Sequence, residues 1–112
     1  MIPRRVAAAL LALGLAACAG LAQKGAVLSA SEEISEREYA KALEDAEFAI
    51  SLEPDPAVLP EAYLLKAEAL SQMERKTEAL AVYRFLIHAY PESGAAYQAR
   101  GRLTELGESC AR

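Results

Sequence analysis

Few side chains in this sequence carry nucleophilic, redox or metal-binding chemistry. The 112 residues include two cysteines, Cys18 and Cys110, and one histidine, His88. His88 has no further His or Cys at ligand spacing, so we predict a helix-surface histidine without a metal. No glycine-rich phosphate loop, Ser-His-Asp set or Cys-His pair can be assembled. We therefore predict a protein that is not an enzyme, with no catalytic residue, metal or cofactor.

The residues before Cys18 have the pattern of an export signal. Two arginines, Arg4 and Arg5, precede an uninterrupted run of Ala, Leu, Val and one Gly over residues 6–17. A basic start followed by a short apolar run is typical of an export signal. The run is shorter than the roughly 20 apolar residues that a membrane-spanning helix needs. We predict that residues 1–17 are a signal peptide.

Leu15-Ala16-Ala17-Cys18 resembles the bacterial lipobox. The resemblance implies cleavage between Ala17 and Cys18 and attachment of a diacylglycerol, with fatty acyl chains such as palmitate, to the Cys18 thiol, which is the nucleophile. By the same resemblance, Ala19 implies export to the outer membrane, with the body facing the periplasm. Ordinary cleavage after Ala17-Cys18-Ala19 remains the alternative and would release a soluble exported protein.

The charge balance limits the class of partner. Twelve Lys and Arg against 16 Asp and Glu give a net charge of -4, which argues against nucleic acid, because phosphate binding needs a surplus of cations. An acidic body is not attracted to anionic lipid, so the acyl chains would have to hold it. Cys110 would then be the second thiol, either free or in a disulfide with another chain.

The helical elements begin after a weakly patterned segment. Gly20 and Gly25 loosen residues 18–36, which we predict to be the lipidated Cys, a tether and a weak helix. Ser35 and Glu38 form a capping-box pattern, so a helix should start there and end before Pro54. Its apolar positions recur at helical spacing. They are Tyr39, Ala42, Leu43, Ala46, Ala49 and Ile50.

Three further helices are predicted. Pro60 suits the first turn of one helix, and the polar run Glu74-Arg75-Lys76-Thr77 separates it from the next. Pro91 stops that helix, Ser93 caps the last one, and Gly107 ends it. The predicted helical domain is 37–106, followed by a tail at 107–112.

The helices repeat at a fixed spacing. Tyr63 and Tyr97 are 34 residues apart, whereas Ala42 and Ala79 are 37 apart, because the loop at 54–60 holds three more residues. Thirty-four residues is the tetratricopeptide period. The chain resembles the tetratricopeptide repeat family over about two-thirds of its length, with Glu74 where the family usually has Gly. The expected repeat-packing residues are Ala42, Tyr63, Ala67, Ala79, Tyr83, Pro91, Tyr97 and Gly101.

This resemblance implies an all-α fold, a short stack of helix-turn-helix units with one complete repeat and two half repeats. It also implies a protein-binding adaptor or scaffold in an envelope assembly, pilus or secretion machine. A self-associating structural lipoprotein, a homo-oligomer without a dedicated client, is the alternative. By resemblance, the concave face that binds a peptide would include Leu64, Glu68, Ser71, Gln72, Gln98, Arg102 and Glu105.

Overall fold

Five helices make up the part of the chain that the computed structural model describes, residues 3–52 and 55–107. They are α1 (Arg4–Ser35), α2 (Tyr39–Leu52), α3 (Leu59–Gln72), α4 (Lys76–Ala89) and α5 (Gly94–Glu105). The described residues contain no strand, so the predicted all-α helix-turn-helix class is confirmed. Pro54, Cys110 and the tail beyond Gly107, on which the sequence made predictions, lie outside these ranges.

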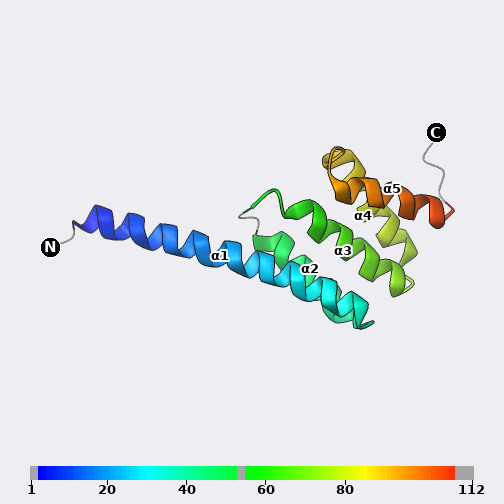
Figure 1. Ribbon diagram of the computed structural model, residues 1–112, viewed down its shortest axis with the longest axis horizontal. Coiled ribbons are helices and arrows are strands. Elements are labelled where there is room, and N and C mark those ends of the chain that lie inside the picture. Colours follow the sequence, from blue (N-terminus) through cyan, green and yellow to red (C-terminus); the bar gives the residue numbers. More distant parts are fainter. Residues whose placement is uncertain (1–2, 53–54, 108–112) are drawn as a thin grey trace.

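Consecutive helices pack as antiparallel neighbours, which makes the molecule a stack (Figure 1). Helix α1 packs on α2, α2 on α3, α3 on α4 and α4 on α5. In addition, α1 contacts α3 and α3 contacts α5. The odd-numbered helices therefore share one side of the stack, and residues from all three can line one surface.

Alanine determines how closely these helices approach. Ala42, Ala46, Ala67, Ala79 and Ala99 are all fully buried in the main core cluster. Helix axes come within about 8 Å only where the side chains between them are short. Larger side chains fill the space around the alanines. They include Leu64, Leu70, Tyr83, Leu86 and Leu103.

The two helix hairpins, α1/α2 and α3/α4, reverse direction in the same way. Arg37 (φ 65°) and Glu74 (φ 60°) both adopt the left-handed conformation. In the first turn the Glu38 N–H donates to the Glu33 carbonyl, and in the second the Arg75 N–H donates to the Leu70 carbonyl. These bonds close each helix end as glycine usually does. Glu74 thus takes the conformation of a glycine, although it carries a side chain.

Helix α1 differs from the tether expected over residues 18–36. The helix is continuous from Arg4 to Ser35, and its second half packs on α2, with Val27 and Ile34 partly buried against the core. Ala26 and Ala30 are buried there, together with Gln23 and Glu33. The predicted opening half repeat is therefore a full helix hairpin, and glycine's low helix propensity is overridden by this packing.

The predicted capping box at Ser35 is wrong. Ser35 is the last residue of α1, and its hydroxyl donates 2.6 Å to the Glu32 carbonyl of the same helix. Helix α2 begins after the turn, at Tyr39. The prediction for Ser93 is confirmed, because its Oγ accepts a 3.0 Å hydrogen bond from the Ala96 N–H at the start of α5. Pro60 occupies the first turn of α3 as expected.

Candidate functional site

A groove of about 260 Å³ opens on the side of the stack that α1, α3 and α5 share. Its walls come from the last turns of α1, α3 and α5, and a tyrosine of α4 also lines it. We call this feature the binding groove. The residues that line it are Ile34, Glu68, Ser71, Gln72, Tyr83, Arg102, Glu105 and Leu106.

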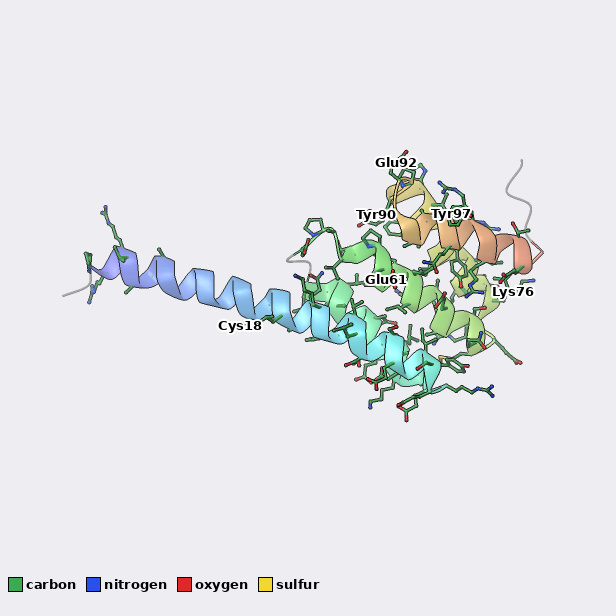
Figure 2. The ribbon with its side chains drawn as sticks, in the orientation of Figure 1. Cys18, Glu61, Lys76, Tyr90, Glu92 and Tyr97 are labelled. Carbon is green, nitrogen blue, oxygen red and sulfur yellow. The ribbon has the colours of Figure 1, made fainter. Side chains whose placement is uncertain are left out.

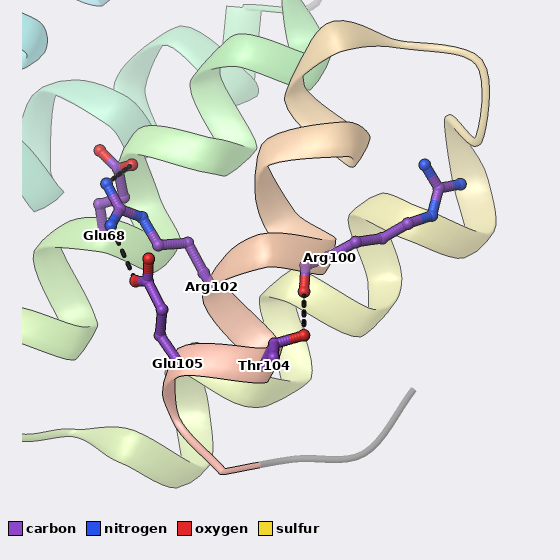
Figure 3. Close-up of polar contacts among 5 residues, drawn as sticks. All are labelled: Glu68, Arg100, Arg102, Thr104 and Glu105. Atoms are coloured by element: carbon purple, nitrogen blue, oxygen red, sulfur yellow. Dashed lines mark hydrogen bonds and ion pairs between the residues drawn. The ribbon is translucent and has the colours of Figure 1, made fainter. Parts of the chain in front are cut away.

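The charged centre of the binding groove is Arg102, which lies between two carboxylates (Figure 3). Its Nη2 is 3.4 Å from Oε1 of Glu68 on α3, and its Nη1 is 3.0 Å from Oε2 of Glu105 one turn further along α5. Arg100 extends in a different direction, and the Thr104 hydroxyl donates to its carbonyl. The guanidinium is thus already neutralised, so the groove offers no free cation to an incoming carboxylate or phosphate.

Burial changes the acid–base properties of this cluster. Desolvation raises the pKa of Glu68, and the neighbouring Arg102 opposes that rise. The hydrogen bond to Glu105 is the main reason that the pKa of Arg102 is raised. Burial, with a smaller contribution from Glu68, raises the pKa of Tyr83 to about 12. The Tyr83 hydroxyl therefore stays protonated at neutral pH and can donate a hydrogen bond.

Five of the seven residues predicted for the concave face line the binding groove, and two do not. Leu64 is buried in the core, because an apolar side chain on the inner side of α3 is more stable away from water. Gln98 is exposed on α5 but does not line the groove. The sequence reasoning missed three residues that line the groove. Ile34 lay in the segment interpreted as a tether, Tyr83 was expected only as a repeat-packing residue, and Leu106 ends the apolar stripe of α5.

The predicted repeat-packing residues divide into buried and exposed sets. Ala42, Ala67, Ala79 and Tyr83 are buried in the core. Tyr63 is half-buried and packs with Phe85 and Tyr90, at ring-centroid distances of 4.8 Å and 6.1 Å. Pro91, Tyr97 and Gly101 are exposed. Tyr97 and Gly101 differ from the expectation because no helix among the described residues covers that side of α5.

Cys18 lies on α1 where the helix leaves the body of the stack (Figure 2). Its side chain is exposed, so its sulfur is accessible. The side chain of Ala17 lies outside the described residues. Within residues 3–52 and 55–107, no helix is long and apolar enough to cross a membrane, and no cluster of three or more His, Cys, Asp or Glu could hold a metal ion.

The fold and groove define this chain as a short stack of helix hairpins with a charged groove along one side. Comparisons with protein-family models, with curated proteins and with solved structures give no match. Its function is therefore argued from the groove and from Cys18.

Proposed function

We propose that this protein is an outer-membrane lipoprotein of the tetratricopeptide repeat type, anchored through Cys18 and facing the periplasm. In this proposal it acts as an adaptor whose binding groove holds a segment of a protein partner in an envelope assembly, pilus or secretion machine. The observation that supports it is the convergence of Glu68, Ser71, Gln72, Arg102 and Glu105 in one groove. The resemblance to the tetratricopeptide repeat family implies the same residues on the face that binds a partner.

The charges of the groove favour a particular kind of segment. Arg102 is matched by two carboxylates, which leaves the groove with one excess negative charge. Ile34 and Leu106 supply apolar walls at its sides. A segment that carries a Lys or Arg next to an apolar residue fits this arrangement, because a buried cation needs a carboxylate partner.

Affinity purification tests the adaptor role. The full chain with a C-terminal tag is purified from detergent-solubilised membranes, and stoichiometric companions are identified by mass spectrometry. Ser71→Arg places bulk and positive charge in the groove, whereas the matched control Gln98→Arg makes a similar change outside it. We expect the companion to be lost with Ser71→Arg and kept with Gln98→Arg. Equal recovery with both variants would refute the groove as the binding site.

The anchor has a separate test. Lipidated Cys18 adds the mass of its acyl groups to the purified protein, and Cys18→Ser should remove this mass and release the protein from the membrane fraction. An unmodified Cys18 in the wild-type protein would refute the anchor but not the groove.

A self-associating lipoprotein is the second candidate. Tyr97 is 77% exposed, whereas its repeat equivalent, Tyr63, packs against Phe85 of α4 and Tyr90 at the end of α4. A second copy could cover Tyr97 in the same way. Purification of the protein without a companion, as a homo-oligomer that Tyr97→Ser dissociates, would favour this function over the adaptor.

A further inference from the structure

Helix α1 carries two exposed leucines on the side that faces away from α2. Leu21 is 72% exposed and Leu28 is 71% exposed, and their spacing of seven residues places them on one side of the helix. Cys18 precedes Leu21 by three residues, which is about one turn. Large apolar side chains with so much exposure on one line of a helix are typical of a surface that contacts something else.

A shallow hollow extends this line toward α3. Leu28 and Val27 of α1 line it together with Ala57 and Val58, which precede α3, and its volume is about 400 Å³. Lys24 and Glu61 are the charged residues of its lining. We call Leu21, Val27, Leu28, Ala57 and Val58 the apolar edge.

Continuous helix joins Cys18 to the apolar edge, so no flexible segment separates them. Gln23, five residues after Cys18, is fully buried, and its Nε2 donates to the carbonyls of Ala49 and Asp55, both at 3.4 Å. Five residues of α-helix rise by only about 7.5 Å. Cys18 lies where α1 meets the body of the stack (Figure 2), so a lipid on Cys18 would hold the folded body directly at the membrane surface.

We propose that the apolar edge lies in the lipid headgroup region of the membrane that holds the acylated Cys18. The inference rests on the proposed lipidation. Interfacial helices bury their apolar side about 5–10 Å into the boundary between headgroups and acyl chains. Lys24, between the two leucines, would place its ammonium among the lipid phosphates while its methylene groups lie on apolar surface. In this arrangement the part of α1 from Cys18 to Leu28 lies along the membrane surface.

The polarity of α1 limits how far this contact extends. Leu28 lies about 15 Å along the helix from Cys18, calculated from the rise per residue. Beyond it, the exposed positions of α1 are all polar and favour water: Ser29, Ser31, Glu32 and Ser35. The binding groove begins at Ile34, about 24 Å from Cys18 along the helix axis. The contact would therefore hold the body at one end and leave the groove open to a partner.

Fluorescence quenching in vesicles tests this orientation. The full chain is expressed with Cys110→Ser and either Leu28→Cys or the control Gln98→Cys, and the acylated protein is purified from membranes. The new thiol carries a nitrobenzoxadiazole label, and the protein is reconstituted with phosphatidylethanolamine, phosphatidylglycerol and a lipid with a headgroup nitroxide. Mass spectrometry of each sample counts the acyl groups and the label.

The expected result is quenching roughly threefold stronger at position 28 than at position 98, because only the apolar edge would lie among the headgroups. Adding Leu21→Asp should weaken the quenching at position 28, whereas Ser31→Asp, which adds the same charge to the polar part of α1, should not. Both positions are exposed, so neither change disturbs the core.

Three outcomes would overturn the inference, and they have different meanings. Acylated protein with equal, weak quenching at positions 28 and 98 would refute the docked edge and leave the anchor standing. A concentration-dependent blue shift at position 28 without nitroxide quenching would show that a second copy covers the edge. Protein without acyl mass would refute the anchor, and the docking with it.

Discussion

Replacing Glu74 with glycine should stabilise the protein, because Glu74 holds a backbone conformation that disfavours side chains. Its φ is 60° in the turn between α3 and α4. The left-handed conformation costs a non-glycine residue about 1–2 kcal/mol. Glycine removes that cost but loses about 0.5–1 kcal/mol through the greater freedom of the unfolded chain. We expect Glu74→Gly to raise the free energy of unfolding by roughly 0.5–1 kcal/mol.

Thermal melting followed by circular dichroism measures this gain. For a domain of this size, each 1 kcal/mol shifts Tm by about 4–8 °C, so we expect a rise of roughly 2–8 °C. Glu74→Ala is the matched control, because it removes the carboxylate but keeps a Cβ in the strained conformation. A Tm for Glu74→Gly no higher than that of Glu74→Ala would show that backbone strain at position 74 is not the cause.

Three further substitutions test the packing, the cap and the buried acid. Ala67→Leu should cost about 1–3 kcal/mol by overpacking a fully buried contact, and an unchanged urea midpoint would contradict close packing there. Ser93→Ala should cost about 0.5–2 kcal/mol by removing the α5 cap, and a control melt with Ser93→Asp, which can cap, should retain most of the stability. Burial is the main reason that the pKa of Glu33 is raised above 4.5; Asp45 raises it further and Lys41 opposes the rise. Because the unfolded chain loses this proton at a lower pH than the folded protein does, the free energy of unfolding falls as pH rises from 4.5 to the raised pKa. The difference in stability between Glu33→Gln and wild type should therefore shift in favour of the variant from about pH 4 to about pH 7. The same difference in urea midpoint between variant and wild type at both pH values would refute this reasoning.

Helices α2 to α5 could be predicted from sequence because their signals are local. Apolar residues at helical spacing define each buried stripe, and Pro60, Pro91 and Ser93 mark boundaries that depend only on nearby backbone. The turns were less predictable. A Ser-x-x-Glu pattern at Ser35 suggested a helix start, but the chain had not yet completed the preceding helix, and the Ser35 hydroxyl bonds within it.

The full length of helix α1 could not be predicted, because its buried side carries few large apolar side chains. Its buried positions are Gln23, Ala26, Ala30 and Glu33, two of them polar, and only Val27 and Ile34 add larger apolar side chains against the core. Glu33 forms an ion pair with Lys41 of α2, at 3.5 Å. Close approach of two helices and a cross-helix ion pair are tertiary features, so the sequence of α1 alone contains little sign of them. Ile34 was not predicted to line the groove for the same reason, because it lies on α1.

The residues of the binding groove were predictable to the extent that helical spacing fixes them. Glu68, Ser71 and Gln72 lie on consecutive turns of α3, and Arg102 lies 34 residues after Glu68, so the repeat places them side by side. Arg102 and Glu68 are indeed in contact, with 3.4 Å between Nη2 and Oε1. Leu64 was predicted to line the groove but is buried, because spacing alone does not show which turn of the helix enters the core.

The repeat also explains why the two ends of the stack differ. Ala30 and Ala67 are 37 residues apart, as are Arg37 and Glu74, so α1/α2 and α3/α4 are copies of one hairpin in both packing and turn. Helix α5 repeats α3 with a spacing of 34, and Gly101 takes the place of Ala67, yet Gly101 is exposed. The described helices therefore cover this position in α3 and leave the equivalent position in α5 uncovered. The apolar edge of α1 and this side of α5 lie at opposite ends of the stack, so the proposed membrane docking at one end would leave the other end open to a partner or a second copy.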